Sequence, residues 1–352
     1  MSHTALLDAA PSRTVQLCSI RRSGLLDLKE CIISGLRETP RTMPSLLLWD
    51  DQGLKNFDTW TKDPAYYPKR CEWEILTNYQ QDIARHFPVS NLTKTACLLA
   101  AMEKERQRVY YYALDVSDDA LYKNLGALKK QFAQSQFISI SGLSGTYDDC
   151  AEWLASSASL PVSTVTFLWL GNSVGNLTQQ DVSVLLGQLH QACRKMSANC
   201  NFLISADCCA VEERILKAYG PNEGPSRKFL FHGLHHANRL LGKEVFREDE
   251  WNAVPEWDNV KNELRYSYTP KKDIQLDIEE LHISLKTDEP VHYFMSAKWN
   301  ESQIGLIAER AGLKVGNIWR DTQKEYCFYL LQSKMDVSGS VDHNVTPERS
   351  LI

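Results

Sequence analysis

Hydrophobic and polar positions along the middle of the chain follow two periods in turn. Short runs of β-prone apolar residues alternate with longer segments whose apolar residues recur at helical spacing. The run at 164–170 (TVTFLWL) is apolar throughout, which is typical of a strand buried on both faces of a sheet. The expected strands are 109–114, 137–140, 164–170 and 201–206, and the expected helices are 91–106, 117–132, 147–156 and 178–196. This order predicts an α/β fold with a doubly wound parallel sheet.

In such a sheet the ligand site lies outside the carboxyl ends of the strands. The residues that follow the expected strands therefore deserve examination, and they are Asp115, Thr146, Tyr147, the turn Gly171–Asn176 and Asp207. An acid in the position of Asp115 either accepts the ribose hydroxyls of a nucleotide cofactor or caps the next helix. The glycines and asparagines of the turn either let backbone approach a ligand closely or form a tight strand-to-helix connection.

Beyond Asp207 the alternation breaks. A helix at 211–219 ends at Gly220-Pro221, a usual stop signal, and residues 222–290 are rich in His, Trp and charge, with a strand expected at 278–285. A strand at 291–299, a capped helix at 300–312 and a closing hairpin at 314–332 follow. We expect a flexible N-terminus at 1–20, an α/β domain at 21–207 and 291–334, an inserted unit at 208–290 and a disordered tail at 335–352.

Composition narrows the class of protein. The 352 residues are 43 % hydrophobic and 24 % charged, as in ordinary soluble globular proteins, and the net charge of −5 argues against a nucleic-acid-binding protein. Apolar runs fall short of the roughly 20 residues that cross a membrane, and the N-terminus lacks the pattern of a secretory signal. We therefore expect a cytoplasmic protein without membrane or nucleic-acid partners, and a monomer.

Cysteine and histidine spacing gives no support to a metal centre. The ten cysteines show no paired spacing, so reduced thiols are expected rather than disulfides or a zinc site. His232, His235 and His236 (FHGLHH) have no nearby Cys or Glu at standard ligand spacing. A role at the surface or in an aromatic pocket is favoured for these histidines.

Several segments taken together resemble one known family. They are LWDDQGLKNFDTW, DPAYYPKRCEWEIL, YYALDVS, GTYDD, LWLGNSVGNLT, LKAYG and MSAKW. In these segments the chain resembles the histidine-specific, S-adenosylmethionine (SAM)-dependent methyltransferases of ergothioneine biosynthesis and their fungal relatives, over roughly residues 25–333. The resemblance implies a Rossmann-like methyltransferase domain, an inserted α+β substrate-binding domain and methylation of the α-amino nitrogen of a small amino acid.

The resemblance also implies which residues hold the cofactor. Asp115 matches the acid that holds the ribose, and Tyr147 matches the aromatic residue beside the adenine. Thr146 stands where bacterial members have an acid, so its contact with the adenine amino group would differ. Lys94 matches a lysine near the methionine end of the cofactor.

Five further positions match residues around the substrate's backbone and cavity. Tyr66, Asn176 and Tyr219 match the residues that grip the carboxylate and the amino group. Trp49 and Phe57 match aromatic residues that line the cavity. The resemblance implies catalysis by positioning, with no covalent nucleophile and no metal.

Phe294 departs from the histidine-specific members, which place a glutamate there to bind the imidazole. Strand alternation puts Phe294 and Ser296 on one face, with Leu264 lining the same pocket from the inserted unit. A phenyl ring packs well against an indole, and this burial and stacking would contribute about 2–3 kcal/mol. The resemblance therefore indicates the fungal branch that methylates tryptophan-type amino acids, once and then again; 4-dimethylallyltryptophan and histidine remain alternatives.

A second departure concerns the first strand of the sheet. The family carries a strand and an acidic, glycine-rich turn before the helix with Lys94, whereas this chain has Pro88-Val89-Ser90-Asn91 there. A strand is not readily built from residues 86–90, so the sequence predicts a gap in the sheet. The alternative function is accordingly a catalytically impaired member or isoform that lacks the glycine-rich strand.

Overall fold

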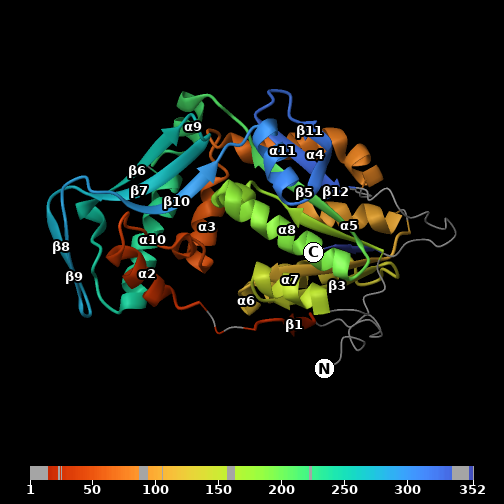
Figure 1. Ribbon diagram of the computed structural model, residues 1–352, viewed down its shortest axis with the longest axis horizontal. Helices are drawn as coiled ribbons and strands as arrows, with labels where there is room; N and C mark the ends of the chain where they lie inside the picture. Colours follow the sequence, from red (N-terminus) through yellow and green to blue (C-terminus); the bar gives the residue numbers. More distant parts are fainter. Residues whose placement is uncertain are drawn as a thin grey trace.

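The computed structural model describes residues 15–22, 24, 26–86, 94–104, 106–156, 163–221, 224–334 and 349–351. An eight-stranded sheet lies at the centre, in the order β1-β3-β2-β13-β4-β5-β12-β11 (Figure 1). The first six strands in this order are parallel, and β12 and β11 are antiparallel additions. The bounds are β1 Leu17–Ser19, β2 Val109–Asp115, β3 Ile138–Ser144, β4 Thr164–Trp169, β5 Asn199–Asp207, β11 Leu313–Arg320, β12 Tyr326–Ser333 and β13 Arg349–Leu351.

Helices cover both faces of this sheet, and each face has its own hydrophobic core. One core takes in residues of α4, α5 and α6, and the other takes in residues of α7, α8 and α11. The bounds are α4 Tyr67–His86, α5 Lys94–Lys104, α6 Asp118–Gln131, α7 Tyr147–Ser156, η2 Ser173–Asn176, α8 Gln179–Lys195, α9 Glu212–Tyr219 and α11 Glu301–Arg310. The doubly wound arrangement expected from the sequence is confirmed.

Local signals account for where several helices begin. Ser117 caps α6, Thr178 caps α8 through the backbone of Asp181, and Asn300 forms a capping box with Gln303. Each cap satisfies backbone N–H groups that have no partner inside the helix. These starts match the sequence expectations to within a residue or two.

A smaller unit lies beside the sheet domain (Figure 1). It contains an antiparallel sheet in the order β10-β7-β6, a hairpin of β8 and β9, and helix α10. The bounds are β6 Trp251–Asp258, β7 Glu263–Pro270, β8 Ile274–Ile278, β9 Leu281–Leu285, β10 Val291–Ala297, α10 Pro225–Leu241 and η3 Glu248–Glu250. The expected single strand at 278–285 is wrong, because a tight turn with Glu279 at φ 52° separates β8 from β9.

Elements from before residue 61 also join this smaller unit. Helices α2 (Leu28–Arg37) and α3 (Asp51–Trp60) and the turn η1 (Ser45–Leu48) pack on α10. Strand β10 pairs with β7 rather than with the large sheet. The division at 208 and 290 stays a proposal, and the packing shows that segments on both sides of it meet in one unit.

The slot between β2 and β4 is filled from the far end of the chain. Strand β13 pairs in parallel with Val109–Tyr111 of β2 and with Thr164–Thr166 of β4. The predicted gap is thus bridged over three residues, and 349–351 are a strand where a disordered tail was expected. Residues 17–19 likewise pair with β3, although they fall in the segment expected to be flexible. Residues 1–14, 87–93 and 335–348 lie outside the described residues.

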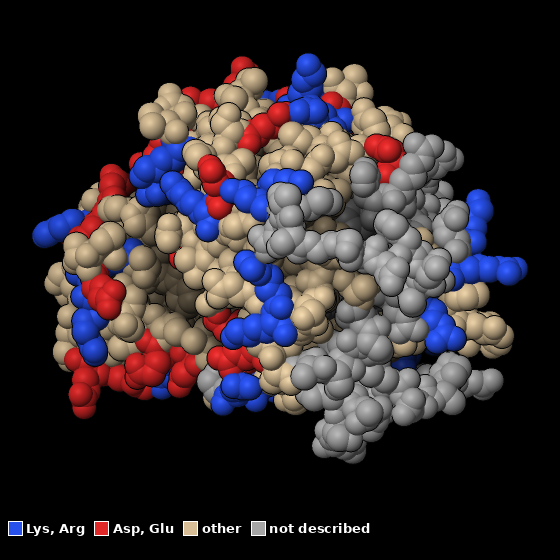
Figure 2. Space-filling model, turned by 45° about the vertical axis from the view of Figure 1, so that its right-hand side comes forward, with Lys and Arg blue, Asp and Glu red and all other residues tan. Residues whose placement is uncertain are grey.

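Charged side chains of both signs are spread over the face in Figure 2, and acidic ones gather along its lower left edge. Within the described part of the chain, no helix is both long and apolar enough to cross a membrane. The nine cysteines whose side chains the structure describes are free thiols.

Candidate active site

A cavity of about 870 Å³ lies in the sheet domain between β2 and β4. Strand β13 stops opposite Tyr111 and Thr166, so residues 112–115 and 167–169 extend beyond it and line the cavity. Helix α6 lines one side, and residues of α7 and α8 line the other. Asp115 and Tyr147, two of the predicted cofactor residues, both lie in this lining.

Local hydrogen bonds hold Asp115 in place beside the cavity, whereas Ser117 is the residue that caps α6. It ends β2, and one carboxylate oxygen accepts the backbone N–H of Ser117 at 2.8 Å, at the start of α6. Its carbonyl oxygen accepts the N–H of Gly145 at 3.0 Å. These bonds fix the carboxylate at the carboxyl edge of the sheet while it still borders the cavity.

The other three predicted cofactor residues differ in their surroundings. The ring of Tyr147 is half exposed and lies 5.4 Å from that of Trp169, on the rim of the cavity. The Thr146 hydroxyl instead caps α7, because it donates to Asp149 Oδ2 at 2.8 Å and accepts the N–H of Asp149. Lys94 begins α5, and its side chain is outside the described residues.

Five of the predicted substrate residues form one continuous aromatic cluster. Ring centroids are 6.3 Å apart for Phe294 and Trp49, 5.2 Å for Trp49 and Phe57, 6.1 Å for Phe57 and Tyr66, and 5.3 Å for Tyr66 and Tyr219. The five rings come from the residue after η1, from α3, from the loop before α4, from α9 and from β10. The fold therefore brings together residues that are up to 245 positions apart.

Sequence reasoning missed several aromatic members of this cluster, among them Trp60, whose ring lies 5.8 Å from that of Phe57 and 5.1 Å from that of Tyr66. Phe229 of α10 lies 5.1 Å from Trp49, and Tyr266 of β7 lies 5.4 Å from Phe294. The Tyr266 hydroxyl also donates to the carbonyl of Tyr219 at 2.9 Å. The signal for Phe229 was the helical spacing of apolar residues in 225–241, a stretch that was interpreted by composition alone.

The expected common face of β10 is confirmed by the strand register. Phe294 pairs with Tyr266, and Ser296 pairs with Leu264, so all four side chains share one face of the β10-β7 sheet. Leu264 is fully buried. Ser296 is buried as well, and it accepts a hydrogen bond from Lys298 Nζ at 2.6 Å.

Asp207 organises the polar end of the cluster. Its carboxylate accepts hydrogen bonds from the hydroxyls of Tyr67 (2.8 and 2.9 Å) and Tyr219 (2.9 Å) and from the N–H of Cys209 (3.1 Å). Lys298 Nζ lies 3.3 Å from Asp207 Oδ2, and both side chains are completely buried. The strand-end position singled out Asp207, but no local pattern pointed to Tyr67 or Lys298 as its partners.

The turn after β4 links this network to β10. Asn172, in the left-handed region at φ 58°, accepts the N–H of Asp207 at 2.9 Å and donates weakly to Ser296 Oγ at 3.4 Å. A Cβ on Gly175 would lie 2.9 Å from the carbonyl oxygen of Ala297, so the close backbone approach expected here is made to β10. Asn176 ends η2, and its side chain makes no hydrogen bond with the residues that the structure describes.

Burial controls the protonation of the tyrosines and the lysine. It raises the pKa of Tyr66 and of Tyr219, and the nearby Asp207 charge raises both further. Both phenols therefore stay neutral near pH 7. Burial lowers the pKa of Lys298, and the Asp207 carboxylate opposes this shift.

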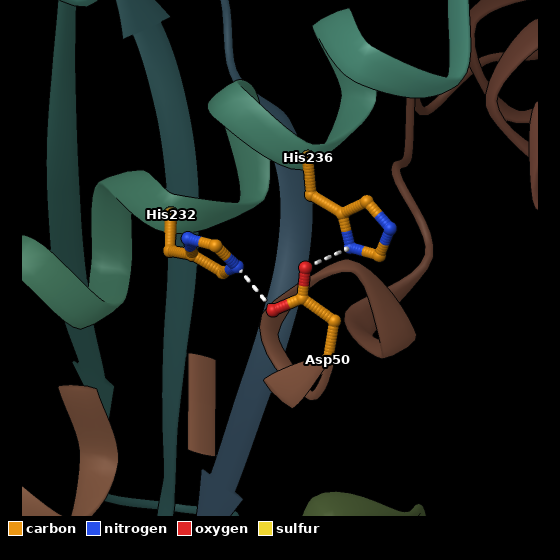
Figure 3. A group of neighbouring side chains, drawn as sticks. All are labelled: Asp50, His232 and His236. Carbon is orange, nitrogen blue, oxygen red and sulfur yellow. Dashed lines mark hydrogen bonds and ion pairs between the residues drawn. The ribbon is translucent and has the colours of Figure 1, made fainter. Parts of the chain in front are cut away.

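Figure 3 shows a second polar group, in which His232 and His236 of α10 converge on Asp50. His232 Nε2 lies 2.5 Å from Asp50 Oδ1, and His236 Nδ1 lies 3.6 Å from Oδ2. The three could each offer one ligand atom to a metal ion. The acidic partner of His232 is thus Asp50, which lies 182 residues earlier in the chain.

The bonds around Asp50 fit a structural clamp better than a metal centre. Asp50 caps α3 through the N–H of Gly53 at 2.8 Å, and the Arg239 guanidinium bonds its Oδ2 at 2.5 Å. His236 Nδ1 lies 3.0 Å from the carbonyl of Leu47, which requires a proton on that nitrogen. Burial lowers the pKa of His232, which leaves a neutral ring that donates to Asp50. We call these bonds the Asp50 clamp; they join α3 to α10.

A doubly wound sheet with a strand-end acid beside a cavity is an arrangement by which many α/β enzymes bind a nucleotide cofactor. The profile described as "Histidine-specific methyltransferase, SAM-dependent" matches residues 28–333. The chain therefore belongs to this family of SAM-dependent methyltransferases, and SAM is its methyl donor.

Curated relatives agree with this assignment. The chain is 36 % identical over 325 residues to the N-methyltransferase imqF of Aspergillus flavus, covering 90 % of this chain and 88 % of that protein. It is 37 % identical over 320 residues to the N-methyltransferase benX of Aspergillus terreus, covering 88 % and 89 %. It is 30 % identical over 327 residues to the 4-dimethylallyltryptophan N-methyltransferase easF of Epichloe festucae var. lolii, covering 86 % and 94 %.

Proposed function

We propose that this protein transfers a methyl group from SAM to the α-amino nitrogen of L-tryptophan, first once and then a second time. The observation that carries the proposal is the position of Phe294 in the aromatic cluster. Its ring packs against Trp49 and Tyr266 on the face of β10 that also holds Ser296.

The chemistry of this face suits an indole better than an imidazole. An imidazole buried here needs an acceptor for its N–H, and a phenyl ring is a poor one. An indole gains from apolar burial and from edge or offset contacts with several rings. The relative that acts on 4-dimethylallyltryptophan supports a tryptophan-type substrate, and the prenylated amino acid is the second candidate.

The residues at the carboxyl edge of the sheet fit SAM. The cavity volume of about 870 Å³ is within the roughly 300–1,000 Å³ of small-molecule sites. Asp115 would accept the ribose hydroxyls, and Tyr147 would flank the adenine. Thr146 is committed to capping α7, so an adenine contact there would come from its neighbours. When bound, the cofactor supplies an electrophilic methyl group on sulfur.

The chain's own residues would orient the amino acid and keep water away. Tyr66, Tyr219 and Asn176 would hold its amino and carboxylate groups by hydrogen bonds. The buried, neutral phenols stabilise an amine that has lost its proton better than they stabilise an ammonium, because burial disfavours charge. Because these residues would hold the amine lone pair in one place, the entropy loss of a bimolecular encounter is met on binding and not in the chemical step.

The test is a competition assay. The purified protein is incubated with SAM and equal amounts of tryptophan, histidine and 4-dimethylallyltryptophan, and products are read by mass spectrometry. Methylated tryptophan should be the main product. Mainly methylated histidine would contradict the pocket argument, and mainly methylated 4-dimethylallyltryptophan would favour the second candidate. Absence of product would support the impaired form, with the bridged slot between β2 and β4 as the cause to examine.

A further inference from the structure

Lys298 is a buried lysine to which the proposed reaction gives no direct role. It follows β10, and its side chain is completely buried. A buried ammonium group is costly unless it is fully paired. Its surroundings therefore show what it does.

The ammonium nitrogen of Lys298 has three close neighbours. It donates a hydrogen bond to Ser296 Oγ at 2.6 Å and forms an ion pair with Asp207 Oδ2 at 3.3 Å. It also lies over the ring of Tyr219, 3.7 Å from the centroid, which is a cation–π contact. Lys298 thus contacts both predicted ends of the substrate pocket, Tyr219 at the amino-acid end and Ser296 at the side-chain end.

These bonds determine which way the Ser296 hydroxyl points. An ammonium group has no lone pair, so Lys298 donates and Ser296 accepts. The Asn172 amide also donates to Ser296 Oγ, because its oxygen is already taken by the N–H of Asp207. Because Lys298 and, more weakly, Asn172 donate to its oxygen, Ser296 would offer its O–H to a ligand. Its partner on a ligand must therefore be an acceptor, such as the electron-rich face of an aromatic ring.

The same ion pair orients Tyr219 from two sides. Its hydroxyl proton is directed to Asp207, and its ring face rests on the Lys298 ammonium. The phenol therefore presents an oxygen lone pair rather than a proton to its other neighbours.

We propose that Lys298, paired with Asp207, is a positioning residue that sets the hydrogen-bond polarity of the substrate pocket: Ser296 as donor and Tyr219 as acceptor. This inference rests on the proposed amino acid N-methyltransferase function and deepens it. Lys298 thereby determines which hydrogen-bonding group Ser296 presents to the side chain of the substrate.

The test uses Lys298→Met, which keeps the length of the side chain and removes its charge and donors. The KM for tryptophan should rise about tenfold or more, as expected when hydrogen bonds from a charged group are lost, while the Kd for SAM stays within about twofold of wild type. Lys314→Met is the matched control, because Lys314 is exposed on β11 and distant from the cluster. It should leave both values unchanged.

A double variant separates positioning from simple neutralisation of Asp207. Lys298→Met alone leaves a buried, unpaired carboxylate and should lower the melting temperature. Asp207→Asn/Lys298→Met removes both charges, so its melting temperature should recover while the KM for tryptophan stays high. The double variant also keeps the test available if the single variant does not fold.

Two results would overturn the inference. One is a Lys298→Met protein with wild-type KM, and the other is a double variant that recovers both stability and KM. A wild-type protein that methylates histidine or 4-dimethylallyltryptophan instead contradicts the tryptophan assignment only, and the same variants are then read on that substrate.

Discussion

The cavity and the aromatic cluster, which we propose as the cofactor end and the substrate end of one site, are built in contrasting ways. At the substrate end, aromatic rings touch one another in series, and the Asp207 carboxylate is bonded by four different groups. At the cofactor end, a cavity of about 870 Å³ separates β2 from β4, and a strand of three residues bridges the sheet below it. One end is held by interlocked side chains, and the other depends on backbone pairing to a short segment.

This difference indicates which parts of the molecule tolerate substitutions. Side chains from five elements over-determine the substrate end, so losing one contact should alter selectivity before it alters folding. The cofactor end relies on few backbone bonds inside a sheet, where each unpaired polar group carries a desolvation cost. We therefore expect the largest effects on stability near β13 and the largest effects on selectivity near Phe294.

The largest effect is expected from breaking the pairing of β13. Ser350→Pro removes a backbone N–H inside a central strand, where proline is poorly tolerated, and should cost about 2–3 kcal/mol of unfolding free energy. Urea unfolding measures the loss, with Ser350→Ala as the matched control. Equal stability of the two variants would show that β13 contributes little to the sheet.

The next effect concerns the strand-end acid. Asp115→Ala should weaken SAM binding about 10- to 100-fold, because two hydrogen bonds to a charged acceptor are lost. Calorimetric titration with SAM measures the change. Asp119→Ala, on the exposed first turn of α6, serves as control and should bind SAM as wild type does. Unchanged affinity in Asp115→Ala would contradict the ribose assignment.

A change confined to the substrate end is expected at Phe294. Phe294→Ala should raise the KM for tryptophan about 10- to 30-fold through lost apolar burial, with little change in the Kd for SAM. Phe294→Glu should gain histidine turnover, because it restores an acceptor for the imidazole N–H. Steady-state kinetics with both amino acids decide this, and a Phe294→Glu protein without histidine turnover would weaken the pocket argument.

The smallest effect is a pH dependence at the Asp50 clamp. Because burial holds the pKa of His232 below its usual value of 6.5, the unfolded chain binds a proton more readily than the folded one. Stability should therefore fall as the pH drops below about 7, by about 1 kcal/mol or less. His232→Asn should flatten this slope, and His282→Asn, on an exposed strand, should not. Thermal unfolding from pH 7.5 to 5.5 measures it.

Local patterns were enough to predict much of the sheet domain and part of the site. The caps at Ser117, Thr178 and Asn300 act within one turn of helix, so they are readable from neighbouring residues. The common face of Phe294 and Ser296 follows from the two-residue period of a strand. The resemblance to a family added Asp115 and Tyr147, which line the cavity, and the five rings, which the structure brings into one cluster.

Only the tertiary structure decided the contacts between distant segments. Asp50 with His232, Asp207 with Lys298, and β13 between β2 and β4 join positions 91 to 240 residues apart, and no local period encodes such pairings. Each depends on a buried polar group or strand edge finding its complement once the layers have packed, since leaving it unpaired would cost free energy. The sequence by itself thus determined the elements and the class of chemistry, and packing decided which charges and backbone edges satisfy one another.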